Sequence, residues 1–316
     1  MRNSKTKGQR AFIAALVVLI LGLLVSIPFF APSYMTVLFT SILMYMIIAV
    51  SWTLFSGPTG NISLASAAFF GVGIYTAAIV GMNLPFPLVI VSGALVSGGL
   101  AFLVGMLTLR LRGIYFVMFT FGLVELLLHF ILWWEVNITG TTGRVVPPIS
   151  NTAVFYVMLL ILVILVLTVF FIRRSRYGLA LEGIGENQEA ASHTGINITA
   201  LKVTIFAVSG LFMGAAGAVI ATRWTYIDPK IAFNPLISFM PVLMAIFGGM
   251  RPLYGPIIGA AIFTYLEEFL ITRFPYHYML IFGIIMVVAI LYMPNGLVGL
   301  AERVWKSLSR RRYAHT

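Results

Sequence analysis

Residues able to do acid–base or metal chemistry are few and scattered in this chain. It contains nine acidic residues, four histidines and no cysteine, which excludes disulfide, iron–sulfur and cysteine–zinc chemistry. Glu125 and His129 are four residues apart, so they would share one face of a helix. Glu267 and Glu268 are adjacent, and we expect both pairs near the outer ends of apolar segments. Glu125 and His129 then form either a proton or substrate contact or a hydrogen-bonded pair at the membrane surface.

The other polar residues give no catalytic pattern. His193 and His277 are isolated, and no group of His, Asp and Glu has the spacing of a metal site. The sequence has no Gly-x-Ser-x-Gly turn and no Gly-x-x-x-x-Gly-Lys-Ser/Thr phosphate loop. We therefore expect no catalytic residue, no metal and no cofactor on this chain, and any ATPase that drives it must be a separate chain.

Composition defines the class of protein. The 316 residues are 60% hydrophobic and 9% charged, with a mean hydropathy of +1.04. Many apolar runs reach about 20 residues, the length a helix needs to span a membrane, and the alternation of a β-barrel is absent. The net charge of +11 comes from residues at helix ends and tails, which indicates orientation signals and lipid contact, not nucleic acid binding.

The sequence predicts an all-α, polytopic membrane helix bundle with about ten transmembrane helices. The first apolar run could instead be a secretory signal peptide, but its length favours a membrane helix. The expected spans are residues 11–30, 34–55, 64–80, 88–109, 114–132, 153–172, 203–222, 236–247, 257–271 and 276–293.

Positive charge orients this topology. With both termini in the cytoplasm, sixteen of the 20 Lys and Arg residues fall on the cytoplasmic side, as the positive-inside rule requires. We expect one membrane domain of five parts. These are a cytoplasmic tail (1–10), a first helical half (11–172), a cytoplasmic loop (173–202), a second helical half (203–293) and a second cytoplasmic tail (294–316).

Small residues and helix breaks suggest where a solute could pass. Segments 64–80 and 203–222 are rich in Gly and Ala, which lets helices approach closely in lipid. Phe55-Ser56-Gly57 and Phe247-Gly248-Gly249 break apolar runs at matching places, which indicates two pseudo-symmetric halves and a transport path. Plain helix packing would also explain the glycines. The path candidates are Gly57, Gly60, Asn61, Ser63, Ser66, Phe69, Gly248 and Gly249.

The segment from Arg173 to Lys202 is the only long polar stretch. Residues 179–191 predict one or two short amphipathic helices, Gly195 then ends them, and Asn197 can cap the next helix. A loop of this length is usually functional. We interpret it as a cytoplasmic docking surface, with a solvated connector as the alternative.

Three blocks of sequence carry a resemblance to a known family. The run Glu189-Ala190-Ala191-x-x-x-Gly195 resembles the EAA-x-x-x-G loop of permeases in ATP-binding cassette (ABC) importers. Together with Glu186-Asn187, residues 60–76 and residues 248–260, the pattern is similar to the branched-chain amino-acid permease family. The resemblance implies the ABC importer permease fold. It also implies an ATPase-coupling loop made of Glu186, Asn187, Glu189, Ala190, Ala191 and Gly195.

The resemblance also implies partners and a place in the cell. A homologous second permease subunit, two ABC ATPase subunits that hold ATP and Mg, and an extracytoplasmic solute-binding protein would surround this chain in the bacterial inner membrane. The binding protein would dock on the outer loops near 133–150 and 223–235. Gly185 stands where the family usually has Arg, and Ala65-Ser66 where it often has Gly-His. Urea, short amides or another small solute are therefore alternative cargoes, and an ion-coupled secondary carrier is the alternative mechanism.

Overall fold

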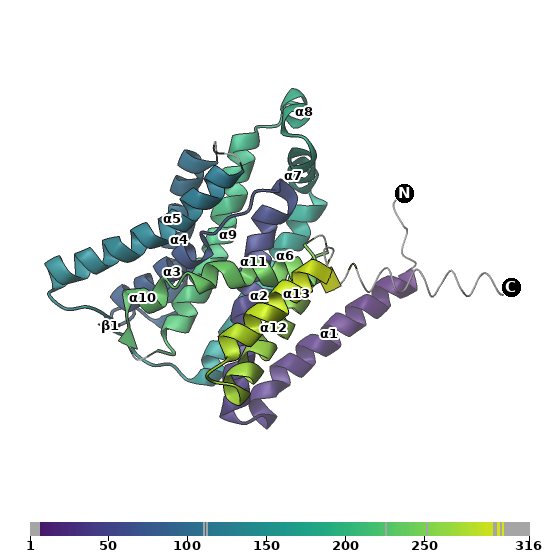
Figure 1. The fold of residues 1–316 in the computed structure, drawn as a ribbon. Helices are drawn as coiled ribbons and strands as arrows, with labels where there is room; N and C mark the ends of the chain where they lie inside the picture. Colours follow the sequence, from purple (N-terminus) through teal and green to yellow (C-terminus); the bar gives the residue numbers. More distant parts are fainter. Residues whose placement is uncertain are drawn as a thin grey trace.

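The computed structural model describes residues 7–292 except 110, 112, 225 and 251, together with 296, 297 and 299. The described part is almost entirely helical (Figure 1). Its helices are α1 (Lys7–Phe30), α2 (Ser33–Thr59), α3 (Ser66–Val80), α4 (Phe86–Thr108), α5 (Ile114–Trp134), α6 (Asn151–Arg174), α7 (Arg176–Glu186), α8 (Gln188–His193), α9 (Ile198–Ala221), α10 (Pro229–Ala232), α11 (Leu236–Gly248), α12 (Tyr254–Arg273) and α13 (Tyr278–Tyr292).

The predicted all-α polytopic bundle is confirmed. A helix covers most of each of the ten apolar segments expected from the sequence. Among the described residues, seven helices are long and apolar enough to cross a membrane, while α3, α13 and the apolar part of α1 are shorter. The count of ten spans and the pseudo-symmetry of two halves stay predictions.

Small residues bring α3, α4 and α9 into close contact, as the Gly- and Ala-rich segments predicted. A Cβ atom on Gly73 of α3 would collide with the backbone of Gly214 in α9. A Cβ atom on Gly214 would in turn collide with the side chain of Ser97 in α4. Since the backbones themselves touch, this three-helix core depends on glycine at these positions.

The third expected span, 64–80, is helical only from Ser66 onward. The α2 helix continues through Pro58 to Thr59, beyond the predicted break at Ser56, because Gly60 with φ of 68° provides the left-handed terminus. Residues 60–65 are not helical and run back along α2, where the indole Nε1 of Trp52 donates to the carbonyl oxygen of Ser63 at 2.7 Å. The helix α3 therefore begins only at Ser66, inside the bundle.

The segments between helices gather at two ends of the bundle. At one end, Gly185 of α7 lies against Pro58, and Gly57 lies near the carbonyl oxygen of Met250. At the other end, strand β1 (Arg144–Val145) pairs antiparallel with β2 (Tyr226–Ile227). This grouping matches the topology expected from the sequence, in which successive connecting segments lie on opposite sides of the membrane. In that topology, residues 55–62, 173–202 and 248–256 share one side.

Candidate functional site

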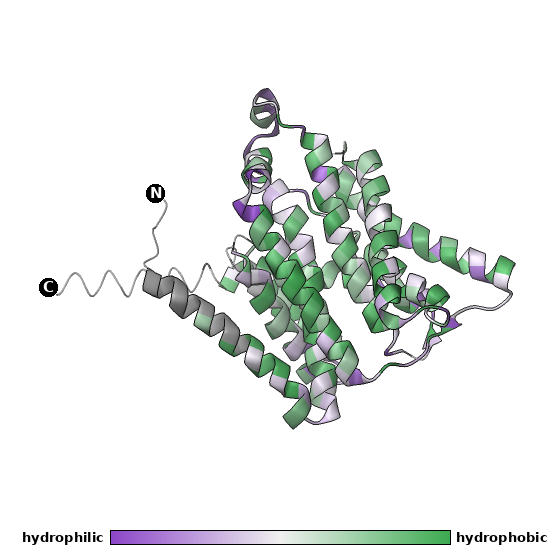
Figure 2. Cartoon of the chain, turned by 180° about the vertical axis from the view of Figure 1, so that it is seen from behind, coloured by the Kyte–Doolittle hydropathy of each residue, from purple (hydrophilic) through white to green (hydrophobic). Residues whose placement is uncertain are grey.

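The polar loop between α6 and α9 folds into two short helices, α7 and α8, that project from one end of the bundle (Figure 1). Figure 2 shows hydrophilic residues concentrated there, whereas the bundle is mainly hydrophobic. The Oδ1 atom of Asn187 accepts hydrogen bonds from the N–H groups of Glu189 and Ala190 at 3.0 and 3.1 Å, which caps α8. Gly195 follows α8 with φ of 80°, so it reverses the chain as predicted. Asn197 caps α9 through the N–H of Ala200 at 3.0 Å.

The six predicted coupling residues lie together around α8. Glu186, Asn187, Glu189, Ala190 and Gly195 are exposed. Ala191 is buried and packs α8 onto the protein. The structure thus presents a small polar projection that Ala191 anchors to the protein. The coupling role of these residues stays a prediction.

Two residues that support this projection were not among the coupling residues predicted from the sequence. The Nζ atom of Lys202 lies 3.2 Å from the Oε1 atom of Gln188, and it donates a hydrogen bond that joins α9 to α8. Gly185 was noted only as a departure from the family pattern. A Cβ atom there would collide with the carbonyl oxygen of Pro58 at the end of α2, so glycine is what allows α7 to sit against the bundle.

Three of the predicted path residues, Ser63, Ser66 and Phe69, line one buried cavity. The other five do not line it. Gly57, Gly60 and Asn61 lie at the end of α2, and Gly248 and Gly249 pack against the start of α12. The predicted path residues therefore form no single surface in this conformation.

The buried cavity has a volume of about 10 Å³, which is room for about one water molecule. Its remaining lining includes three side chains that sequence analysis missed, Trp52, Phe206 and Ser209, because no local pattern connects α2 with α9. The Oγ atoms of Ser56 and Ser66 are buried there without a hydrogen-bond partner among the described residues. Two unpaired hydroxyls in an aromatic cavity are the polar groups through which a solute could be held.

At the opposite end, a buried carboxylate organises the outer loop. Residues 135–139, predicted as loop, continue α5 as a turn of π-helix that contains Glu135, which is 1% exposed. Its Oε1 atom lies 3.4 Å from the Nε atom of Arg144, and its Oε2 atom accepts from the N–H of Gly143 at 2.8 Å. The hydroxyl of Tyr226 donates to the carbonyl oxygen of Thr142 at 2.6 Å. These contacts join the two predicted docking loops, 133–150 and 223–235, into one unit.

Arg223 contributes a further cation to this end of the protein. Burial lowers the pKa of its guanidinium from the usual value, but an arginine stays charged at neutral pH. Sequence analysis placed Arg144 and Arg223 on the outer side only through the charge count, and it did not identify Glu135 as a buried partner.

Glu125 and His129 differ from expectation in both position and contact. Because helix continues to Thr139, Glu125 lies about 17 Å along a helix of about 39 Å, near its middle and not toward its outer end. The Nε2 atom of His129 is 3.9 Å from the Oε2 atom of Glu125, too far for a hydrogen bond. The side chain of His129 is 74% exposed, and that of Glu125 is 41% exposed. A charge exposed to lipid at the centre of a membrane helix costs about 2.5–3.5 kcal/mol on insertion scales.

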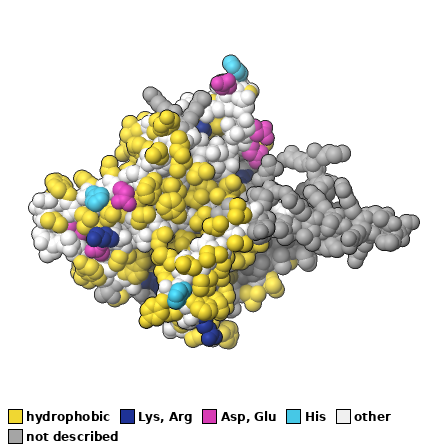
Figure 3. Space-filling model, in the orientation of Figure 1, with side chains coloured by type: hydrophobic (Ala, Val, Ile, Leu, Met, Phe, Trp, Pro, Cys, Tyr) yellow, Lys and Arg dark blue, Asp and Glu magenta, His cyan; other side chains and the backbone are white. Residues whose placement is uncertain are grey.

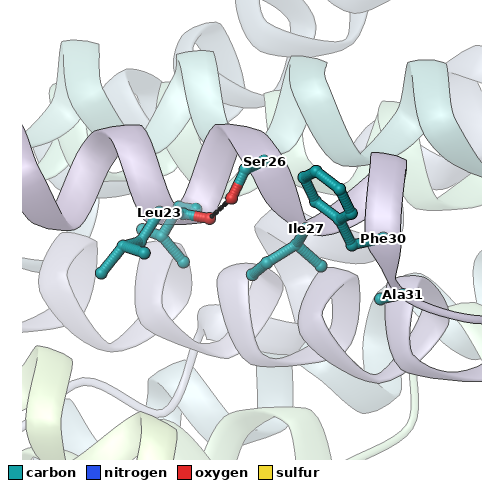
Figure 4. Close-up of a pocket in the computed structure, with 6 residues that line it drawn as sticks. Leu23, Ser26, Ile27, Phe30 and Ala31 are labelled. Carbon is teal, nitrogen blue, oxygen red and sulfur yellow. Dashed lines mark hydrogen bonds between the residues drawn. The ribbon is translucent and has the colours of Figure 1, made fainter.

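A larger hollow of about 460 Å³ lies beside α1 and is lined by Leu23, Leu24, Ser26, Ile27, Phe30 and Ala31. Figure 4 shows that the hydroxyl of Ser26, the only polar side chain there, donates to the carbonyl oxygen of Leu23, at 2.8 Å. Among the described residues that line this hollow, no polar side chain is left to recognise a solute. Among the described residues, no group of three or more His, Cys, Asp or Glu could hold a metal ion.

A bundle with seven candidate membrane spans among the described residues defines a multi-pass helical membrane protein. The chain belongs to the family described as the branched-chain amino acid transport system, permease component, which matches residues 34–290. It is thus an ABC transporter permease and a multi-pass inner-membrane protein.

Curated relatives agree with this family. The chain is 27% identical to the high-affinity branched-chain amino acid transport system permease protein LivM of Salmonella typhimurium, and equally to that of Escherichia coli. Each match covers 94% of this chain and 76% of the relative. The ribose import permease protein RbsC of Haemophilus influenzae is 25% identical over 90% of this chain and 92% of its own length. No solved structure matches the chain.

Proposed function

We propose that this chain is the permease subunit that carries branched-chain amino acids through an ABC importer. It pairs with a homologous second permease subunit, binds two ATPase subunits that hold ATP and Mg, and receives solute from an extracytoplasmic binding protein. Both termini lie in the cytoplasm. The observation that carries this proposal is the projecting α7–α8 unit, which presents Glu189 and Ala190 on an exposed, capped helix and Gly195 just after it.

Each end of the molecule has a part in the mechanism. The binding protein docks on the loop unit held by Glu135 and Arg144, and the ATPase pair holds α8. When ATP closes the ATPases, α8 moves with them, and the two permeases change between outward-open and inward-open states. Coupling of this kind requires that both sites favour the same state of one two-state element. The cavity at Ser66 has room for about one water molecule, so it must widen before a solute can pass.

The amino acid cargo is supported by the LivM relatives, which cover most of this chain. An uncharged path suits it, because the apolar side chain of leucine or valine meets aromatic residues while its polar end meets serine hydroxyls. Ribose is a second candidate cargo because the relative RbsC matches along nearly its whole length.

Reconstitution tests the proposal. The full complex in proteoliposomes should take up labelled leucine, isoleucine or valine only with ATP and the binding protein present. Excess unlabelled valine should compete, and ribose, urea and acetamide should not. Replacing Gly195 with valine should abolish uptake while ATP hydrolysis continues, because valine disfavours a φ of 80°. Uptake without any ATPase would overturn the proposal in favour of a secondary carrier, and competition by ribose, urea or acetamide would reassign the cargo.

A further inference from the structure

The helix α5 is the least covered of the candidate spans. Only 22% of its most apolar window is buried inside the chain, against 39–78% for the other six. It lies at the edge of the bundle, away from α1 (Figure 1). Its inner side contacts α3 and α10, and the rings of Phe116 and Phe121 reach α2, α9 and α11. Most of its remaining surface faces outward.

The outward surface of α5 has a regular composition. Exposed or half-exposed residues recur about one turn apart, and together they form what we call the α5 face: Tyr115, Met118, Gly122, Glu125, Leu126, His129, Phe130 and Trp133. At Gly122 an added Cβ atom would meet nothing within 4 Å. The centre of the face is therefore open and carries no side chain, one turn from an ionisable pair.

A lipid-facing helix of this same chain looks different. The exposed residues of α6 include Leu160, Ile164, Leu167 and Phe171, and α6 has no Asp, Glu, His, Lys or Arg before Arg173. Figure 3 shows mainly hydrophobic side chains over the visible surface of the bundle. Glu125 and His129 are thus exceptional among the exposed residues of these two helices, and ionisable residues inside membranes face protein or a water-filled path.

We propose that the α5 face is the surface on which the second permease subunit docks. This inference rests on the proposed importer, and it assigns Glu125 and His129 a position between two membrane subunits. The partner chain supplies a polar side chain at the depth of the pair and a helix close to Gly122, because small residues allow close approach in lipid. A water-filled path between the two subunits would then begin beside Glu125.

Other occupants do not suit this surface. The face runs along the apolar length of α5, so a soluble ATPase or binding protein could reach only its ends. Within this chain, residues 301–316 carry five Lys and Arg residues, which is the wrong composition for an apolar surface at membrane depth. The helix α1 lies on the other side of the bundle in both ribbon views (Figures 1 and 2).

Photocross-linking in intact cells tests the surface. Leu126 and Leu160 are matched leucines, 61% and 58% exposed, on α5 and α6. Each is replaced in turn with the photoreactive residue p-benzoylphenylalanine in cells that also express the second permease, the ATPase and the binding-protein subunits. Position 126 should give a product containing two permease-family chains, identified by mass spectrometry. Position 160 should give at least tenfold less.

The cross-linking result and the uptake measurement together distinguish an error in the docking surface from an error in the proposed cargo. If position 126 yields no more product than position 160, or a product with an ATPase or binding protein, the assignment of the α5 face is overturned. Leucine uptake is measured in the same cells. Normal uptake with no cross-link at position 126 rejects only this surface, whereas a strong cross-link without amino acid uptake supports the surface and rejects the proposed cargo.

Discussion

Gly185 of α7 rests directly on the carbonyl oxygen of Pro58, in the last turn of α2. The helix α2 is 67% buried over its apolar window and packs against α6, α9, α11 and α12. The base of the exposed α7–α8 unit is thus in contact with a central helix of the bundle. Motion of the coupling loop can be transmitted to α2 through the α7–α2 interface, of which this backbone contact is the tightest point.

Replacing Gly185 with alanine should weaken that contact. The new Cβ atom would force α7 away from α2, at an overpacking cost of about 1–3 kcal/mol. We expect leucine uptake per ATP hydrolysed to fall several-fold in proteoliposomes. Gly183→Ala in the same helix is the matched control, because nothing lies within 4 Å of its added Cβ. Equal coupling ratios for the two variants would show that the contact transmits nothing.

Asn187→Ala should loosen α8 while leaving the other exposed coupling residues in place. It deletes two hydrogen bonds at the N-terminus of α8, worth about 1 kcal/mol for an N-cap. We expect a weaker association with the ATPase subunits, measured by copurification in mild detergent. Asn187→Ser keeps a capping oxygen and should restore most of the association. If serine behaves like alanine, the amide itself contacts the ATPase, and the capping explanation is wrong.

The sequence predicted the helices well because apolar length and capping residues act locally. Ser150 and Asn197 begin α6 and α9 as N-caps, and Gly195 ends the coupling segment with a positive φ. The start of α3 at Ser66 was not predicted, because it depends on the distant indole of Trp52 and the hydroxyl of Thr120, which accepts from the N–H of Leu64.

The candidate sites also differ in whether their residues are close together in the sequence, and this decides whether they could be predicted. The coupling residues from Glu186 to Gly195 are contiguous, so a motif could identify them together. The cavity is built from α2, α3 and α9, whose residues are far apart in sequence, and only Ser63, Ser66 and Phe69 were selected beforehand. Likewise, the pairing of Glu135 with Arg144 depends on where the chain turns at Gly140 and Gly143, and no periodicity predicts it.

Glu135→Gln should destabilise the outer loop unit. The glutamine keeps the hydrogen bond from the N–H of Gly143 but leaves the cation of Arg144 without its charge partner. Breaking one side of a buried ion pair costs about 3–5 kcal/mol. Because Arg144 is partly exposed, with 24% of its side chain accessible, we expect the lower end of that range or less.

A double-mutant cycle measures this coupling. The melting temperature of the purified complex should fall with Glu135→Gln, and Arg144→Met should recover part of the loss by removing the unpaired cation. Binding-protein stimulation of ATP hydrolysis should fall in parallel, since the same contacts shape the docking loops. Additive effects of the two substitutions would show that the ion pair contributes nothing.

Gly73→Val should prevent assembly of the α3–α4–α9 core. Its side chain would occupy the space of the Gly214 backbone, and neither backbone can move without separating two helices. We expect loss of folded protein, measured by gel-filtration yield in detergent. Gly99→Val is the control, because Gly99 lies on the exposed side of α4 with nothing within 4 Å of its added Cβ. A normal yield of Gly73→Val would show that the helices pack less closely than described.

Ser66→Ala distinguishes a solute contact from a packing position. The Oγ atom of Ser66 has no partner among the described residues, so its removal should change the free energy of unfolding by less than about 1 kcal/mol. Uptake should nevertheless fall, since the lost hydroxyl would have bound the polar end of the solute. Ser97→Ala is the contrast. Its Oγ atom lies 2.9 and 2.8 Å from the carbonyl oxygens of Phe69 and Gly210, so this variant should lose stability. Full uptake and a raised apparent melting temperature in Ser66→Ala would place the transport path elsewhere, because an unpaired buried hydroxyl that no solute uses only destabilises the fold.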